Sequence, residues 1–164
     1  MRKIVLIVAG MLTGIMLSPA AWAQMGMDGP EPKVVYHVDY PGVRRFSAQL
    51  TSTYNMVQHY ENQLIDSDVR IVANSFGVRY FTDKPLEGTP FEAGEELKEQ
   101  REELRGRVKS MMSTYDVEVA ICDITREQLG LSKDDFYEGV TFVDSGVVEV
   151  ARLQQEGFAY VKAE

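Results

Sequence analysis

The sequence is poor in the residues from which many functional sites are built. It holds one cysteine and two histidines in 164 residues. A single cysteine cannot form a disulfide within the chain, nor can it supply a cysteine-based zinc or iron–sulfur site. Two histidines argue in the same way against a histidine-rich metal site. We therefore expect no resident metal and no other cofactor.

Basic residues are also fewer than acidic ones. The chain has 17 Lys and Arg against 25 Asp and Glu, a net charge of −8. Because a phosphate backbone is bound by a basic surface, this balance argues against nucleic acid as the main partner. With 45% hydrophobic and 26% charged residues, the composition is that of an ordinary folded protein. The length allows one domain after a leader, but not two ordinary domains.

The one long apolar run occupies residues 4–17 and has the setting of a secretory signal peptide. Two basic residues precede it, and residues 21–23 (Ala-Trp-Ala) form an A-x-A cleavage site. The run is short for a bilayer span, and an uncleaved N-terminal anchor is the alternative. We expect cleavage of residues 1–23, export to the periplasm of a Gram-negative source, and no stable membrane span afterwards. Residues 24–32 should then form a flexible tail, and residues 33–164 a single domain.

Predicted strands and helices alternate along residues 33–164. Strands are expected at 33–39, 69–73, 117–121, 140–143 and 158–161, and helices at 44–65, 89–114 and 145–156. Shorter helical pieces are expected at 125–129 and 132–137, while residues 78–81 fit a short strand or a helical turn. This alternation is typical of parallel strands with right-handed crossovers. It predicts an α/β fold, a three-layer α/β/α sandwich with a mainly parallel five-stranded sheet.

Apolar positions at helical spacing give each long helix a face to bury. The expected buried residues are Phe46, Leu50, Tyr54, Val57, Tyr60 and Leu64 in the first helix, Leu97, Leu104, Val108, Met111 and Tyr115 in the second, and Val147, Val150, Ala151 and Leu153 in the last. Residues 89–92 (Thr-Pro-Phe-Glu) have the pattern of a capping box that opens the second helix. Ser145 is placed to cap the last helix.

Polar or reactive residues follow four of the predicted strands. They are Asp39, Asn74 with Ser75, Cys122 with Asp123, and Asp144 with Ser145. Parallel strands would bring these groups to one edge of the sheet, where ligands bind in open α/β folds. Because turns are polar, most of the pattern needs no functional explanation. Cys122 is the exception, since cysteine is not a turn residue.

Two interpretations of Cys122 are open. As a thiolate it would be a nucleophile or a persulfide carrier, whereas as a thiol it would be a small buried residue that continues the strand. In an exported protein, an unpaired cysteine must be shielded, used, or paired with another molecule.

Other candidate ligand-binding residues flank Cys122 at the same edge. His37 and Asp39 lie two apart on one strand and could form an acid–base pair, although a half-buried strand histidine is the simpler reading. Ser145 and Gly146 start a helix whose N–H groups could hold an anion.

The order of several segments resembles the DsrE/DsrF-like family of sulfur-metabolism proteins, and within it an exported, intracellular-sulfur-oxidation DsrE-like subgroup. The segments are residues 33–39, 55–59, 69–73, 119–122 and 145–160, the last being the most specific. The resemblance implies a three-layer α/β fold and assembly into homo- or hetero-oligomers. It also implies sulfur relay, because some cytoplasmic members carry sulfur as a persulfide on a cysteine. Many relatives have a His-Gly pair after the second strand, where this chain has residues 74–77 (Asn-Ser-Phe-Gly).

These observations together predict an exported, oligomeric DsrE-like protein that binds or relays sulfane sulfur through Cys122. It would be a carrier beside a donor or acceptor protein rather than a free-standing catalyst, with Asn74, Ser75 and the helix start at Ser145 shaping the pocket. The alternative is a non-catalytic, oligomeric binding or assembly module in which Cys122 is a core residue and helix 89–114 meets a partner. A third hypothesis is a small-ligand enzyme that uses His37 and Asp39.

Overall fold

Five parallel strands form one sheet in the order β4-β3-β2-β1-β5. The strands are β1 (Lys33–Val38), β2 (Asp68–Ala73), β3 (Glu118–Cys122), β4 (Thr141–Val143) and β5 (Ala159–Val161). The computed structural model describes residues 31–162, so the predicted leader and residues 24–30 of the predicted tail lie outside the described part. The predicted α/β class and the parallel sheet are confirmed.

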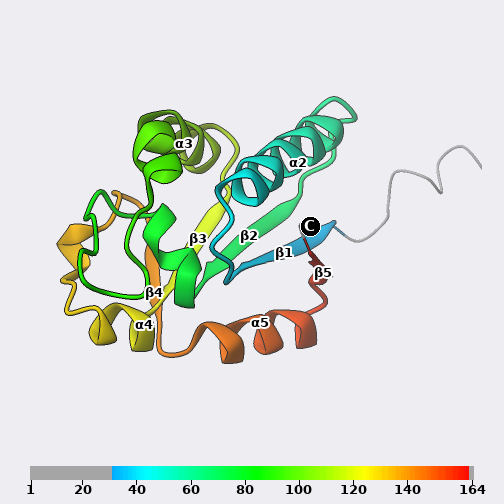
Figure 1. Ribbon diagram of the computed structural model, residues 1–164. Coiled ribbons are helices and arrows are strands. Elements are labelled where there is room, and N and C mark those ends of the chain that lie inside the picture. The colour runs from blue at the N-terminus through cyan, green and yellow to red at the C-terminus, as the bar shows by residue number, and fades with distance from the viewer. Residues whose placement is uncertain (1–30, 163–164) are drawn as a thin grey trace, which may run out of the picture. The chain divides into compact units, whose positions relative to one another are not determined.

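Helices cover both faces of this sheet, as Figure 1 shows. The long helices α2 (Val43–Glu61) and α3 (Glu95–Thr114) lie on one face, and α5 (Gly146–Gln155) lies on the other. The short helix α4 (Asp123–Gln128) follows β3 directly, and two 3-10 helices, η2 (Ser75–Tyr80) and η3 (Lys133–Asp135), lie in the connections. Within residues 31–162, no helix has the length and apolar character that crossing a bilayer requires.

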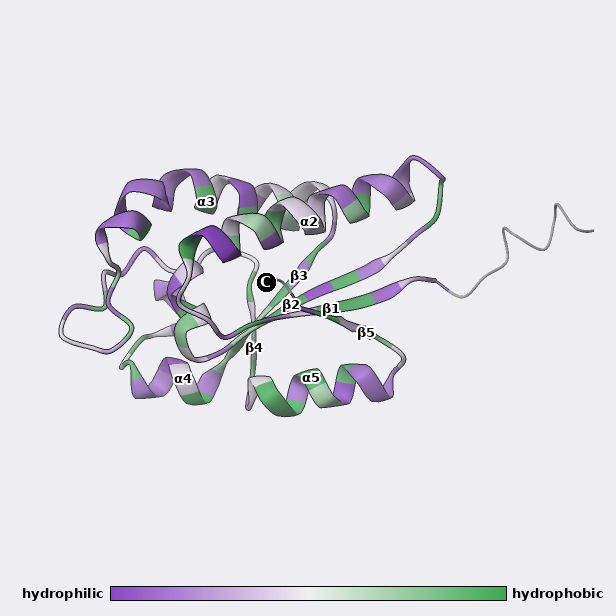
Figure 2. Ribbon diagram, turned by 45° about the vertical axis from the view of Figure 1, so that its right-hand side comes forward, coloured by the Kyte–Doolittle hydropathy of each residue, from purple (hydrophilic) through white to green (hydrophobic). Residues whose placement is uncertain are grey.

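The sheet is apolar on both faces because both are covered, as is usual for parallel sheets. Odd and even positions of each strand face opposite layers, so Val34, Tyr36 and Val38 of β1 join the larger core under α2 and α3. Val35 of β1 and Val72 of β2 belong instead to a smaller cluster under α5, with Val150, Leu153 and Phe158. Most residues of α3 are hydrophilic (Figure 2), and its buried side chains are four of the five predicted.

A tight turn follows β2 and lies directly on the end of β1. The Asn74 amide donates to the Val38 carbonyl at 3.1 Å, and Ser75 has a left-handed backbone with φ of 48°. A Cβ atom at Gly77 would lie 1.8 Å from the Val38 carbonyl oxygen. Only glycine therefore fits at this position of η2. Of the ambiguous segment at 78–81, residues 78–80 belong to this 3-10 helix and Phe81 is its C-cap residue.

Three predictions about the first helix were wrong: where it ends, and the burial of Leu64 and of Tyr54. The helix ends at Glu61, because residues 62–64 form a turn in which Leu64 has φ of 57°. Leu64 is consequently 93% exposed rather than buried. Tyr54 is also exposed, and its ring meets the edge of Tyr115 at 5.6 Å between centroids. Helical spacing alone placed both residues on the buried face.

The predicted capping box at 89–92 was also wrong. The carboxylate of Glu92 accepts from the Gly88 amide at 3.2 Å, and the Thr89 hydroxyl accepts from the Phe91 amide at 3.2 Å. These bonds close a turn, and the helix begins only at Glu95, after the N-cap residue Gly94. The Thr89 hydroxyl and the Glu92 carboxylate, which could have capped a helix, therefore stabilise a turn instead.

The last helix buries a narrower face than predicted. Val150 and Leu153 are buried, but Val147 is 61% exposed and Ala151 is exposed as well. The buried positions are Gly146, Val150 and Leu153, at a spacing of four and then three residues. Ser145 occupies the N-cap position without a side-chain hydrogen bond to the helix.

Candidate functional site

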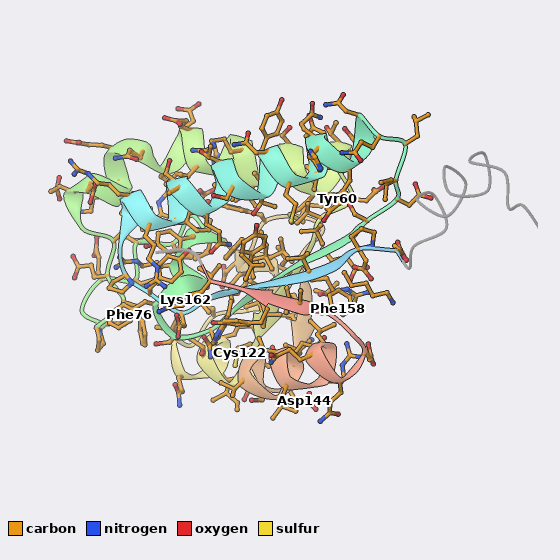
Figure 3. All side chains as sticks on the ribbon, turned by 90° about the vertical axis from the view of Figure 1, so that its right-hand side faces the viewer. Tyr60, Phe76, Cys122, Asp144, Phe158 and Lys162 are labelled. Carbon is orange, nitrogen blue, oxygen red and sulfur yellow. The ribbon has the colours of Figure 1, made fainter. Side chains whose placement is uncertain are left out.

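The carboxyl ends of β1 to β4 meet at one edge of the sheet, since all four strands are parallel. The predicted polar groups therefore emerge together, as expected. On the α5 side of this edge, three side chains come from neighbouring strands or their ends: His37 from β1, Asn74 after β2, and Cys122 from β3. Figure 3 shows Cys122 between the sheet and α5.

Cys122 is the last residue of β3 and a free thiol. Its exposed fraction is 4%, so the resting thiol is shielded from solvent. The last register pair of β2 and β3 is Ala73 with Ile121, which puts Asn74 and Cys122 side by side as the next pair.

The first residue of α5 lies against both of these side chains. A Cβ atom at Gly146 would be 3.1 Å from the Asn74 Cβ and 3.3 Å from the Cys122 Cβ. This approach is closer than most residues tolerate, and glycine permits it. The first turn of α5 thus covers Cys122 directly, and Gly146 belongs to the site that the sequence predicted.

Asn74 is held on its other side by His37. The His37 Nε2 and the Asn74 Oδ1 lie 2.9 Å apart. A carboxamide oxygen only accepts hydrogen bonds, so this contact is a hydrogen bond in the tautomer of His37 whose Nε2 carries the proton. The His37 ring also meets the ring of Tyr160 edge-on at 6.5 Å between centroids. The predicted residues His37, Asn74, Cys122 and Gly146 therefore form one connected group.

The backbone of Ser75 ties two elements together. Its backbone amide donates to the Thr125 hydroxyl at 3.1 Å, which links the turn after β2 to α4. Sequence reasoning missed Thr125, because a threonine inside a short helix carries no signal of its own. Ser75 thus contributes its backbone amide and its left-handed backbone conformation to the turn beside the site.

The charge next to Cys122 is neutralised locally. The Asp123 carboxylate lies 2.5 Å from the Arg126 guanidinium and 3.9 Å from the Lys133 ammonium. The hydrogen bond that Arg126 donates to the Asp123 carboxylate raises the pKa of Arg126. Arg126 also donates to the Leu131 carbonyl at 2.7 Å, which fixes its position. Asp123 therefore adds little net negative potential at the neighbouring sulfur.

Two predicted residues do not join this group. Asp39 lies beyond the end of β1 and is exposed, and the hydrogen bond of His37 goes to Asn74. Ser145 is half-buried at the N-cap of α5, where its carbonyl accepts from the Glu149 amide at 2.9 Å. In the part of the chain that the structure describes, no cluster of His, Cys, Asp and Glu is arranged to hold a metal ion.

Exposed apolar side chains also occur on α4, α5 and β5. They are Ile124, Val147, Val148, Tyr160 and Val161. β5 is also an outer strand of the sheet, with β1 as its neighbour on one side. Exposed apolar side chains together with an outer strand are features of surfaces that bind other chains.

An open groove of about 750 Å³ lies at the opposite edge of the sheet. Its lining comes from the end of α3, the start of β3 and the loop before β4, and includes Lys109, Asp116, Glu118 and Glu138. None of the predicted site residues lines it. The Cys122 group is the better candidate for a functional site. It lies at the carboxyl ends of parallel strands, where open α/β sheets bind their ligands, and it contains a nucleophilic sulfur atom.

The comparisons with known proteins concern both sequence and fold. The model of the DsrE/DsrF-like family matches residues 45–163, which include Asn74, Cys122 and Gly146. The comparison with curated proteins returned no match. Among solved structures, the chain resembles a protein of unknown function from Methanobacterium thermoautotrophicum, with a TM-score of 0.62 and 25% sequence identity. That match covers 80% of this chain and 99% of the other.

Proposed function

Because the chain belongs to the DsrE/DsrF-like family, we propose that it binds or relays sulfane sulfur as a persulfide on Cys122. One observation carries the proposal: the lone cysteine ends a strand at the carboxyl edge of the parallel sheet, against Asn74 and the first turn of α5. This edge is where open α/β sheets bind their ligands. The protein would be an exported, periplasmic and oligomeric carrier that hands sulfur to a partner protein.

The proposed reaction needs no external oxidant when the donor is an inorganic polysulfide. The Cys122 thiol first loses its proton to solvent. Its thiolate then attacks a sulfane sulfur of the polysulfide, and the S–S bond breaks as a shorter polysulfide leaves with the electron pair. Delivery reverses the roles: an acceptor thiolate attacks the outer sulfur of the persulfide, and the Cys122 thiolate leaves. Sulfur is transferred, and no net electrons are gained or lost.

The burial of Cys122 sets conditions on this reaction. With 4% exposure, the thiol can react only when the first turn of α5 or the turn after β2 shifts slightly. A small linear polysulfide needs a narrower opening than a protein thiol does. Shielding also protects the sulfur from adventitious oxidation in an oxidising compartment.

Intact mass of the mature protein tests the proposal. The protein is measured before and after treatment with polysulfide, and again after reduction. We expect a reducible gain of one or more sulfur atoms that is lost in Cys122→Ser and in Cys122→Ala. An unchanged mass, with Cys122 alkylated only after denaturation, would refute the carrier function.

The second candidate function is a binding or assembly module without chemistry. It is favoured by the 4% exposure of Cys122 and by the exposed apolar side chains of α4, α5 and β5. In that case Cys122→Ala should leave the oligomeric state and partner binding unchanged. Sedimentation velocity of wild type, Cys122→Ala and Val148→Glu tests the assembly, and sulfur uptake by the wild type separates the two functions. If the protein is an assembly module, the oligomer dissociates in Val148→Glu and persists in Cys122→Ala. The wild-type protein then takes up no sulfur.

A further inference from the structure

We infer that His37 is a positioning residue, which holds the carboxamide of Asn74 so that its N–H groups face Cys122. The inference rests on the proposed function of Cys122 and names the group that would stabilise its anionic sulfur. His37 lies outside the residues that the family model matches, which begin at residue 45. Its role is argued from the arrangement of three neighbouring strands.

The register of the sheet places Asn74 between the other two residues. His37 pairs with Val72, so its side chain reaches diagonally along β2 to Asn74, two residues further on. On the other side, Asn74 stands level with Cys122, one step beyond the pair of Ala73 with Ile121. All three side chains lie on the α5 face, because Val35, His37, Val72 and Asn74 alternate with the residues of the larger core.

The hydrogen bond with His37 determines whether the oxygen or the nitrogen of the Asn74 carboxamide faces β1. The oxygen and nitrogen of a carboxamide lie on opposite sides of Cγ. With Oδ1 held 2.9 Å from Nε2 of His37, the carboxamide nitrogen lies on the side of Cγ away from that ring, and in our inference this is the side that faces Cys122. Turning the group over would bring its N–H against the N–H of His37. The approach of Gly146 to the Asn74 Cβ restricts movement of the whole side chain.

This orientation matters only for an anionic sulfur. An N–H group stabilises a thiolate or a terminal persulfide anion, whereas a neutral thiol gains little from it. The opposite orientation would present the carboxamide oxygen to the anion and repel it. The proton on His37 Nε2 therefore selects the orientation that supports sulfur transfer.

Paired substitutions at the two histidines test this role. His37→Leu removes the donor, and His37→Gln keeps an N–H donor with a similar reach. His59→Leu is the matched control, because His59 is exposed on α2 and hydrogen-bonds Gln63. The readout is the rate constant for sulfur uptake from inorganic polysulfide, with thermal unfolding as a check on folding.

We expect His37→Leu to slow uptake about tenfold, as loss of one charge-assisted hydrogen bond implies. His37→Gln should stay within about threefold of wild type, and His59→Leu should equal wild type. Asn74→Asp keeps the shape, removes the N–H donors, and should be at least as slow as His37→Leu. Equal slowing in His37→Leu and His37→Gln would indicate a merely structural histidine and overturn the inference. So would wild-type rates in both variants.

A second measurement is independent of cysteine chemistry. The nitrogen-15 spectrum of the folded protein shows which ring nitrogen of His37 carries the proton. A proton on Nε2 supports the orientation, and a neutral ring protonated only on Nδ1 overturns it. A wild-type protein that takes up no sulfur refutes the proposed function instead, so the two failures are distinguishable.

Discussion

Replacing Gly77 by alanine should remove much of the stability of the fold. The new methyl carbon would lie 1.8 Å from the carbonyl oxygen of Val38 and 2.5 Å from its carbonyl carbon. An ordinary C···O contact needs about 3.3 Å, so the turn after β2 would have to move by roughly 1.5 Å. The obstacle is backbone of a central strand, which cannot rotate aside as a long side chain can.

The magnitude follows from what such a movement breaks. It disrupts the bond from the Asn74 amide to Val38 at 3.1 Å, and the bond from the Gly77 amide to Asn74 at 2.9 Å. Each hydrogen bond contributes about 1 kcal/mol, and overpacking adds about 1–3 kcal/mol. We therefore expect a loss of about 3–5 kcal/mol from a total stability of about 5–15 kcal/mol.

Urea unfolding followed by circular dichroism measures this loss. Gly106→Ala is the control, because a Cβ there meets nothing within 4 Å and the residue lies inside α3. It should raise the free energy of unfolding by up to about 1 kcal/mol, since alanine favours helix. A loss below about 1 kcal/mol in Gly77→Ala would refute the reasoning about the turn.

Three further substitutions give expected results of different kinds. Cys122→Ala should lower the free energy of unfolding by about 1 kcal/mol, because it empties only the volume of one sulfur atom; a much larger loss in urea unfolding would contradict this. Burial raises the pKa of Tyr137 to about 12. The Tyr137 hydroxyl therefore keeps its proton more tightly in the folded state than in the unfolded state, where its pKa is about 10. The free energy of unfolding should consequently fall as pH rises from about 10 to 12. Tyr137→Phe should flatten that fall, and an unchanged pH dependence would contradict the assignment. Arg79→Met removes donors to two backbone carbonyls and should cost about 2–3 kcal/mol, as measured by thermal unfolding; an unchanged melting temperature would show that these bonds add nothing.

The sheet was predictable from sequence because its strands are short apolar runs separated by clear helical segments. β-branched residues such as those at 33–38 and 117–121 indicate buried strands, and alternation with helices indicates parallel pairing. Parallel pairing then places the carboxyl ends of the strands at one edge. Errors occurred where two local structures use the same residues, as at 89–92, where Thr89 and Glu92 close a turn.

The candidate site was predictable only as a set of residues at one edge. The predicted positions of the strand ends and of the last helix start indicated His37, Asn74, Cys122 and Gly146. They could not show that His37 bonds Asn74 and leaves Asp39 exposed, because strand register depends on tertiary packing. The exposure of Val147 was missed for a similar reason. Helical spacing finds an apolar stripe but does not fix how α5 is rotated against the sheet.

The pairing of β5 with β1 has a consequence for the order in which the protein can fold. Val34 lies opposite Ala159, so β1 pairs with β2 on one side and with the last strand, β5, on the other. When the chain folds from its amino end, β1 can pair with β2 early but keeps one open side until residues 159–161 are available. Contacts between such distant parts of a chain form slowly, because the loop between them must be closed first. The five-stranded sheet is therefore complete only after β5 has docked against β1.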